Sequence, residues 1–203
     1  MVLSQKAQAT RNRILDAGAE LFYLHGYNAT GLDKVIKRAE ITKGNFYYHF
    51  KSKEALAVAT LESQLALIQQ EIKDQVLKSS NSPLENFFKL LQFLTNKQKV
   101  QHSEGHICGC YFGNFTLELS TSSREVRNKL KEVFNSYLSL FGSLLTQAKE
   151  MGEIPDSIDP VVMSPIIMSQ IEGAILLDKA NQEPKNLDAS IAFIKQVLTA
   201  DPV

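Results

Sequence analysis

The chain has 203 residues, of which 44% are hydrophobic and 22% charged, a composition typical of a globular protein with a sizeable core. No apolar run of about 18 residues is present and residues 1–13 are polar, so we expect no membrane span, no signal peptide and a cytoplasmic location. The net charge is zero, but residues 1–53 carry +5 and residues 54–203 carry −5. This asymmetry indicates a basic binding segment on an acidic body.

Apolar residues recur at helical spacing from the first segment onward. The apolar face of residues 14–24 predicts a helix that ends at Gly26, because glycine readily terminates helices. Thr30 is the predicted N-cap of a second helix. Thr42 is the predicted cap of a short third helix, Lys43 to His49, and Ser52 that of a fourth reaching about Ser79.

The rest of the chain predicts further helices and no strand. Ser82-Pro83-Leu84-Glu85 is a typical helix start, and residues 100–109 predict a loop. Ser122 and Asp159 are predicted caps of two long helices. The predicted helices of this part are 83–99, 110–119, 122–152, 159–180 and 187–198. We therefore predict an all-α fold of about nine helices.

Two short helices joined by a tight turn, within a basic segment, indicate a helix-turn-helix. The unit comprises residues 30–39, the turn Glu40-Ile41, and residues 42–49. In such a unit the second helix enters the major groove of DNA, and its hydroxyl, amide, ammonium and imidazole groups can bind phosphates and bases. The alternative interpretation treats Tyr47, Tyr48 and His49 as ordinary packing residues.

A longer pattern carries a family resemblance. Thr30-Gly-Leu-Asp-Lys-Val-Ile-Lys-Arg-Ala is followed by a Gly-x-x-Tyr-x-His-Phe core at residues 44–50 and by Ser-Lys-Glu-x-Leu at residues 52–56. This sequence resembles the N-terminal signature of the TetR family of transcriptional regulators. The resemblance covers residues 11–56, about a quarter of the chain, and implies a sequence-specific DNA-binding regulator, by family default a repressor, rather than an enzyme. It also implies a DNA-binding domain at residues 1–53 and an effector-binding and dimerisation domain at residues 54–203.

The resemblance implies a role for individual residues. Phosphate contacts are expected from Thr30, Tyr47 and Lys53. Contacts with the DNA backbone or base edges are expected from Thr42, Lys43 and Gly44, and sequence reading from Asn45 and Tyr48. His49 completes the set of groups offered by this helix, while Phe46 and Phe50 are expected in the core. The set of predicted DNA-binding residues is Thr30, Thr42, Lys43, Gly44, Asn45, Tyr47, Tyr48, His49 and Lys53.

One residue departs from the family pattern. Members usually have glycine at the turn between the two helices, where this chain has Glu40. A left-handed backbone there costs a residue other than glycine roughly 1 kcal/mol. Either the turn has another geometry or the fold tolerates this cost, and we have no account of the negative charge near DNA.

The body resembles the family in layout only. The last two helices of members usually form a four-helix bundle with a second subunit, so we expect a homodimer through residues 159–180 and 187–198, reading a palindromic double-stranded operator. The alternative is that the apolar residues of these helices form internal core. Aromatic residues on the middle helices, with Asn114, Glu118, Gln170 and Glu172, are candidates for an effector pocket.

The segment Gly109-Cys110-x-x-Gly-Asn114-x-x-x-Glu118 resembles a stretch in a TetR subgroup that senses electrophiles and oxidants. There the cysteine after glycine is reactive, which implies this role for Cys110. A thiol at a helix N-terminus has a lowered pKa and reacts faster. Cys108 is a candidate partner, although a disulfide between these residues would be strained. The predicted effector and sensor residues are Cys110, Cys108, His106, Tyr111, Phe115, Asn114, Glu118 and Tyr137.

Other interpretations of these residues remain open. Both cysteines could be inert packed thiols. The cluster of His102, His106, Cys108 and Cys110 does not match known zinc spacing, so no metal or other cofactor is predicted. A thiol-dependent enzyme acting on reactive carbonyls, or a helical interaction module that does not bind DNA, are the alternative functions.

Overall fold

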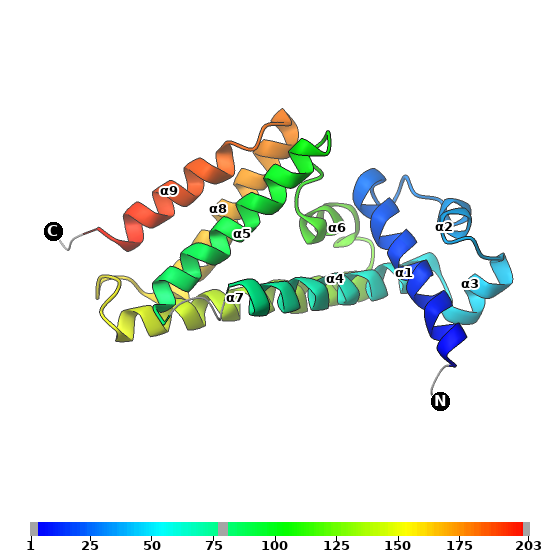
Figure 1. Ribbon diagram of the computed structural model, residues 1–203, viewed down its shortest axis with the longest axis horizontal. Coiled ribbons are helices and arrows are strands. Elements are labelled where there is room, and N and C mark those ends of the chain that lie inside the picture. Colours follow the sequence, from blue (N-terminus) through cyan, green and yellow to red (C-terminus); the bar gives the residue numbers. More distant parts are fainter. Residues whose placement is uncertain (1–3, 77–80, 201–203) are drawn as a thin grey trace. The chain divides into compact units, whose positions relative to one another are not determined.

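The computed structural model describes residues 4–76 and 81–200, which form nine α-helices and no β-strand. The predicted all-α fold of about nine helices is therefore confirmed for the described residues. In chain order the helices are α1 (Gln5–His25), α2 (Leu32–Arg38), α3 (Lys43–His49), α4 (Lys53–Gln75), α5 (Pro83–Ser103), α6 (Tyr111–Leu119), α7 (Arg124–Glu150), α8 (Pro160–Asn181) and α9 (Asn186–Leu198) (Figure 1).

The helices form two compact units, neither of them continuous in sequence. Unit 1 comprises the described residues of 1–68 and 111–133, and unit 2 those of 69–110 and 134–203. Helices α4 and α7 each begin in unit 1 and end in unit 2. Helix α6 belongs to the same unit as the predicted helix-turn-helix. The functional boundary at residue 53 remains a prediction.

Unit 1 is built on α1, which packs on α2 and approaches α4 closely. The Ser4 side chain caps the start of α1, and Gly26, with a φ of +82°, ends it as predicted. A Cβ atom at Gly18 would lie 2.9 Å from the Leu56 side chain, so the absence of a side chain there permits the contact between α1 and α4. The core of unit 1 includes Ile14, Phe22, Val35, Phe46, Leu56, Leu61 and Phe115.

Unit 2 contains α5, α8 and α9, and α9 packs against both of the other helices. The starts of α5 and α8 are those predicted. Ser82 accepts a hydrogen bond from the Glu85 N–H, Asp159 accepts one from the Val161 N–H, and proline occupies the first turn of each helix. The core of unit 2 includes Phe87, Leu90, Leu91, Phe141, Leu145, Ile167, Ile171, Leu187 and Ile194.

A buried carboxylate joins α8 to α9. Asp178 is fully buried and accepts hydrogen bonds from the N–H groups of Lys185, Asn186 and Leu187, at 3.2, 2.7 and 3.1 Å from its oxygens. The Asn186 side-chain amide donates a further bond of 2.7 Å. Lys185, the N-cap residue of α9, gives no side-chain cap, so Asp178 from α8 satisfies the first N–H groups of α9 instead.

Several predicted helix ends were wrong. Thr30 does not cap α2, whose N-cap is Gly31, because the Thr30 hydroxyl is already bonded to carbonyl groups of α1 and its end. Ser123 rather than Ser122 bonds the N–H of Val126 at the start of α7. Helix α5 continues to Ser103, so the predicted loop is shorter. Helix α4 ends at Gln75, and the predicted end at residue 79 lies outside the described residues.

Helix α8 is unusually apolar for its exposure. Among the helices of residues 4–76 and 81–200, it alone is long and apolar enough to cross a membrane, a test that core helices of soluble proteins also pass. Only 22% of its most apolar window is buried within the chain. This helix therefore exposes much apolar surface when the chain is considered alone.

Candidate nucleic-acid interface and sensor cluster

Helix α3 separates a buried aromatic side from an exposed polar side. Thr42 caps it as predicted, accepting a hydrogen bond of 3.2 Å from the Asn45 N–H. Phe46 and Phe50 are buried, as expected. The exposed fractions of Tyr47 and Tyr48 are 50% and 72%. Exposed residues of this surface, which we call the α3 surface, are Thr42, Lys43, Gly44, Asn45, Tyr47 and Tyr48.

The turn before α3 keeps the geometry that normally requires glycine. Glu40 has a φ of +53°, in the left-handed region. Its N–H bonds the Lys37 carbonyl, and the Ile41 N–H bonds the Ile36 carbonyl, the two bonds of a Schellman helix end. Of the two outcomes expected from the sequence, the fold therefore tolerates the cost of a left-handed glutamate. The Glu40 side chain is exposed.

Two of the predicted phosphate-binding residues have partners within unit 1. Thr30 is fully buried, and its hydroxyl donates to the carbonyls of Leu21 and Gly26 at 3.1 and 2.7 Å. The Lys53 ammonium donates to the Tyr27 carbonyl at 2.5 Å and lies 3.9 Å from the centroid of the Tyr27 ring. Burial lowers the pKa of Lys53, and the carboxylate of Glu118 opposes this shift.

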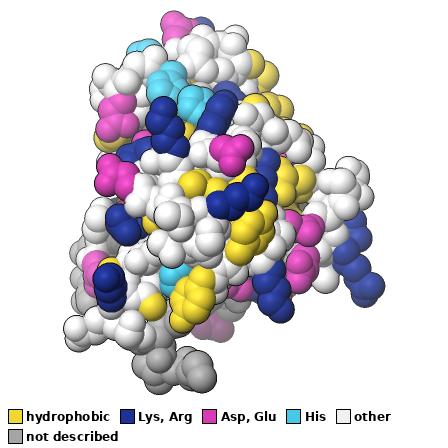
Figure 2. Space-filling view, turned by 90° about the vertical axis from the view of Figure 1, so that its right-hand side faces the viewer, with side chains coloured by type: hydrophobic (Ala, Val, Ile, Leu, Met, Phe, Trp, Pro, Cys, Tyr) yellow, Lys and Arg dark blue, Asp and Glu magenta, His cyan; other side chains and the backbone are white. Residues whose placement is uncertain are grey.

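His49, the last residue of α3, is half-buried. Burial lowers its pKa, and the guanidinium of Arg11 lowers it further. Arg11 lies 5.1 Å from the centroid of the Phe50 ring. Figure 2, viewed from the side on which α3 lies, shows Lys and Arg side chains spread over this face beside hydrophobic ones, with some acidic side chains among them.

The predicted sensor residues fall into two groups. Tyr111 and Phe115 are buried in unit 1, where their rings meet those of Phe22, Tyr23 and Tyr27. Asn114 is half-buried on α6. Glu118, also on α6, accepts hydrogen bonds from the N–H groups of Tyr27 and Asn28. Tyr111, Phe115 and Glu118 attach α6 to α1 and to the segment that follows α1. His106, Cys108, Cys110 and Tyr137 belong to unit 2.

Cys110 directly precedes α6 and belongs to a half-buried polar group that we call the Cys110 cluster: Cys110, Tyr137 and Glu172. A hydrogen bond from the thiol stabilises the Glu172 carboxylate, whereas burial raises the pKa of Glu172. Burial also raises the pKa of Tyr137 strongly, and the nearby Cys110 and Glu172 add to this shift. A thiol is therefore held beside a carboxylate that can accept its proton.

Cys108 has a different environment. It is buried, and burial raises the pKa of its thiol, while Lys179 lowers it and Glu104 raises it. His106 is exposed in the same loop. Among the described residues, no group of three or more His, Cys, Asp and Glu side chains is arranged to hold a metal ion.

Two glutamines that the sequence analysis missed hold the loop before Cys110. Gln182 accepts a hydrogen bond of 2.8 Å from the Ile107 N–H and donates one of 3.1 Å to the Ile107 carbonyl. Gln101 accepts one of 2.8 Å from the Cys108 N–H. Gly109, with a φ of +84°, completes the turn, and a Cβ atom there would lie 3.0 Å from the Lys179 side chain. The Gly-Cys pair was the sequence signal for this loop, because the position of a glutamine in the sequence does not indicate which distant loop it contacts.

Comparison with known proteins gives the family. The family model described as "Bacterial regulatory proteins, tetR family" matches residues 14–60. A second family model, described as "Tetracyclin repressor-like, C-terminal domain", matches residues 87–194, which by themselves are more than half of the chain. The chain belongs to the tetR family of bacterial regulatory proteins. The resemblance read from residues 11–56 is thus confirmed.

Relatives of this tetR-family chain are named as repressors or regulators. The HTH-type transcriptional repressor DhaR of Mycobacterium sp. is 27% identical over 93% of this chain and 91% of that protein. The regulator LmrA of Bacillus subtilis is 30% identical over 83% and 85%. The crystal structure of Escherichia coli NemR in its reduced form has a TM-score of 0.83 and 26% identity, over 95% of this chain and 99% of that one. The chain is therefore a DNA-binding transcriptional regulator of this family.

Proposed function

We propose that the chain represses transcription as a homodimer that places the α3 surface of each subunit in the major groove of a palindromic operator, and that chemical modification of Cys110 releases it. The observation that carries the proposal is the α3 surface itself, a row of exposed polar and aromatic residues fixed on two buried phenylalanines. Such a helix end can enter the major groove. A DNA-bound repressor of a bacterium acts in the cytoplasm.

The contacts with DNA are assigned from exposure and chemistry. Lys43 and Tyr47 are exposed and can bind phosphates, and Asn45 and Tyr48 can reach base edges. Lys53 has two donor N–H groups besides the one bonded to Tyr27, so it can bind a phosphate and keep that bond. Thr30, being buried, is proposed to support the start of α2 rather than to offer its hydroxyl to DNA.

The direct test of the DNA contacts is operator binding by the double variant Tyr47→Ala, Lys53→Ala. An operator is first selected from random-sequence duplexes with the wild-type chain. We expect affinity to fall roughly 100-fold, about tenfold for each contact. Lys131→Ala, which removes the same charge from an exposed site on α7, is the control and should change affinity little. Unchanged affinity of the double variant would contradict the assignment.

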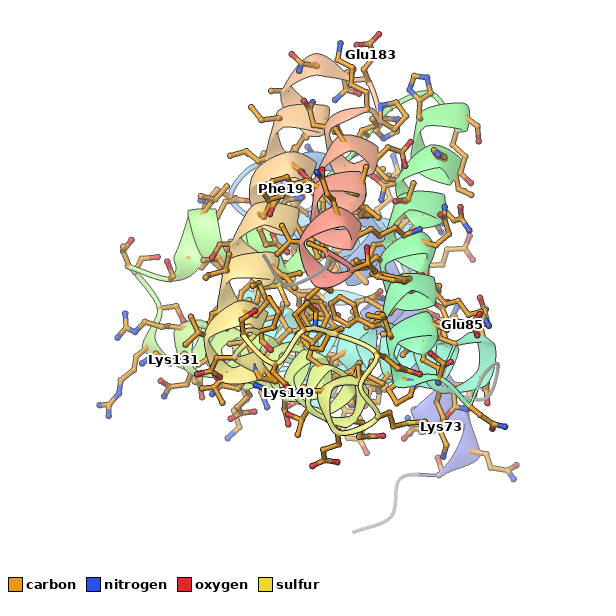
Figure 3. The ribbon with its side chains drawn as sticks, turned by 90° about the vertical axis from the view of Figure 1, so that its left-hand side faces the viewer. Lys73, Glu85, Lys131, Lys149, Glu183 and Phe193 are labelled. Atoms are coloured by element: carbon orange, nitrogen blue, oxygen red, sulfur yellow. The ribbon has the colours of Figure 1, made fainter. Side chains whose placement is uncertain are left out.

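The homodimer is proposed to form through α8 and α9, which lie side by side in Figure 3, where Phe193 of α9 is labelled. The exposed fractions of Val161, Ile166 and Phe193 are 80%, 52% and 56%. Clustered apolar exposure of this extent marks an interaction surface. A two-fold contact would bury these residues and supply the second α3 that a palindromic operator requires.

The dimer is tested by Phe193→Glu, with Leu117→Glu as a matched control. Leu117 is a similarly exposed apolar residue, 73% exposed, but lies on α6 in unit 1. We expect the Phe193 variant to sediment as a monomer at micromolar concentration and the Leu117 variant to remain a dimer, because only the first places a charge in the proposed contact. Two variants with the same sedimentation mass would contradict this interface.

Release is proposed to begin with the Cys110 thiol. The effector class is an electrophilic α,β-unsaturated carbonyl compound: the sulfur bonds to its β carbon, and the thiol proton finally reaches its α carbon. The Glu172 carboxylate accepts the hydrogen bond of this thiol and can hold the proton meanwhile. Cys110 is also half-buried, whereas Cys108 is buried and has a raised pKa. These differences favour Cys110 as the reacting thiol.

The sensor is tested with N-ethylmaleimide on Cys110→Ser and Cys108→Ser. We expect one adduct per chain and loss of operator binding for wild type and Cys108→Ser, while Cys110→Ser keeps its operator affinity. Equal loss of binding in all three proteins would contradict the proposal. Continued consumption of an unsaturated carbonyl compound by unmodified protein would instead identify the thiol-dependent enzyme considered from the sequence.

A further inference from the structure

The segment between α1 and α2, residues 26–31, is held by a carboxylate from α6. We call this segment the α1–α2 junction. Glu118 Oε1 accepts a hydrogen bond of 3.0 Å from the Tyr27 N–H, and Oε2 accepts one of 2.7 Å from the Asn28 N–H. Gly26 makes room for the carboxylate, since a Cβ atom there would lie 2.9 Å from Oε1. Both oxygens of one side chain are thus used on a segment about 90 residues away in sequence.

The same junction is held from its other side by Lys53. The Lys53 ammonium donates to the carbonyl of Tyr27, the residue whose N–H is bonded to Glu118. The ammonium also lies over the Tyr27 ring. A chain of charge-assisted hydrogen bonds therefore connects Glu118 on α6, Tyr27 in the junction and Lys53 in the first turn of α4.

Helix α6 is a firm support for this carboxylate. Its residues Tyr111 and Phe115 are buried, and the Phe115 ring lies 5.9 Å from the ring of Phe22 and 6.1 Å from that of Tyr27, centroid to centroid. The Tyr111 ring lies 5.5 Å from that of Tyr23 on α1. Because these aromatic contacts fix α6 against α1 within unit 1, the position of Glu118 is set before any DNA is bound.

We propose that Glu118 is a positioning residue for DNA binding: from α6 it holds the α1–α2 junction, and through Tyr27 it holds Lys53, in the arrangement that meets the DNA backbone. The helix-turn-helix then depends on a residue far outside residues 1–53. The role rests on the phosphate contact proposed for Lys53. It does not depend on the chemistry proposed for Cys110.

The charge of Glu118 allows its positioning role to be distinguished from a purely electrostatic effect. A carboxylate in a DNA-binding unit repels phosphates, so its removal should by electrostatics alone strengthen binding. Loss of a positioning contact should weaken it. Glu118→Gln keeps the size of the side chain and one acceptor oxygen but removes the charge. Loss of the charge should strengthen DNA binding, whereas loss of a positioning hydrogen bond should weaken it. The sign of the change in Kd therefore distinguishes the two effects. Glu125→Gln is the matched control, because Glu125 is an exposed carboxylate of α7 in the same unit.

The experiment measures the Kd of the full-length chain for the operator duplex selected with wild type. Active fractions are first determined by stoichiometric titration, so that unfolded protein does not enter the Kd. We expect Glu118→Gln to bind about tenfold more weakly, which corresponds to roughly 1.4 kcal/mol. Glu125→Gln should bind as well as wild type or slightly more tightly. A Glu118→Gln variant that binds as tightly as wild type, or more tightly, overturns the proposal.

A double-mutant cycle tests whether Glu118 acts through Lys53. In the Lys53→Gln background, Glu118→Gln should change the Kd by less than twofold, since the group that it positions is gone. Independent, multiplying effects of the two substitutions would overturn the proposed route. If Lys53→Gln alone leaves the Kd unchanged, the phosphate contact of Lys53 is wrong and the inference falls with it. Weaker binding by Lys53→Gln together with unchanged binding by Glu118→Gln would instead contradict only the role of Glu118.

Discussion

The α3 surface and the Cys110 cluster use polar residues in opposite ways. On α3 the polar side chains are exposed, and two buried phenylalanines from the same short segment fix them. In the cluster, the residues come from the end of a loop, from α7 and from α8, and burial raises the pKa of both Tyr137 and Glu172. The first surface is therefore specified locally, whereas the second exists only when distant segments have packed.

This difference separates the expected effects of substitutions. Changes on the α3 surface should alter binding to DNA and leave the free energy of unfolding nearly unchanged, because exposed side chains stabilise the fold little. Changes in the polar contacts of unit 2 should alter stability, most strongly where the polar group is fully buried.

The largest effect is expected from Asp178→Ala. The substitution leaves the N–H groups at the start of α9 without their buried acceptor, so the free energy of unfolding should fall by about 3 kcal/mol. The control is Asp188→Ala, which removes a half-exposed ion pair with Lys99 and should cost less than about 1 kcal/mol. Urea unfolding measures both values. Equal losses in the two variants would show that the buried hydrogen bonds of Asp178 stabilise the fold no more than an exposed ion pair.

A smaller loss is expected from Gln182→Gly. Gln182 has a left-handed backbone with a φ of +54°, so glycine should relieve roughly 1 kcal/mol of backbone strain. Three side-chain hydrogen bonds are lost, two to Ile107 and one to the Lys179 carbonyl, which leaves a net loss of about 2 kcal/mol. Urea unfolding gives the sign of the change. A net gain in stability would mean that Gln182 does not hold the loop before Cys110.

The starts and ends of many helices were predictable from sequence because the features that determine them are local. Caps such as Thr42 and Ser82, the terminator Gly26 and the apolar spacing act within one turn of helix, so sequence neighbours determine them. Thr30 shows where this reasoning fails. Its hydroxyl can accept a hydrogen bond from an N–H group of α2 or donate one to a carbonyl of α1. In the fold it donates to the carbonyls of Leu21 and Gly26, because α1 packs beside it.

The chemical types of the candidate sensor residues could be read from the sequence, but not which of these residues lie together. The Gly-Cys pair marked Cys110, and aromatic residues marked α6. Sequence spacing cannot say that Glu118 lies on the α1–α2 junction while Tyr137 and Glu172 lie beside Cys110, since these contacts join segments far apart in the chain. Polar partners such as Gln182 and Asp178 have no local signature for the same reason.

Glu40→Gly is the counterpart of the Gln182 substitution in unit 1. The backbone at Glu40 has nearly the same left-handed φ of +53°, but its side chain is exposed. Glycine should therefore stabilise the fold by slightly under 1 kcal/mol, roughly the backbone cost alone. Operator affinity should also rise, because a negative charge beside α3 is removed. Unfolding in urea and a Kd at fixed salt measure the two effects, and a destabilised variant would contradict the account of the turn.

The smallest effect, and the one most specific to the Cys110 cluster, is a pH dependence removed by Glu172→Gln. Burial raises the folded-state pKa of Glu172 above its ordinary value of 4.5, with the hydrogen bond from Cys110 opposing the shift. A raised pKa in the folded state favours folding below pH 4.5, and this contribution is lost as the pH rises through the folded-state pKa. The wild type should therefore lose stability relative to Glu172→Gln as the pH increases from about 4.5 to neutrality, whereas exposed Glu125→Gln should follow wild type throughout. Urea unfolding across this range gives the difference, and a Glu172→Gln difference that is constant with pH would mean that the carboxylate beside Cys110 is as well solvated as an exposed one.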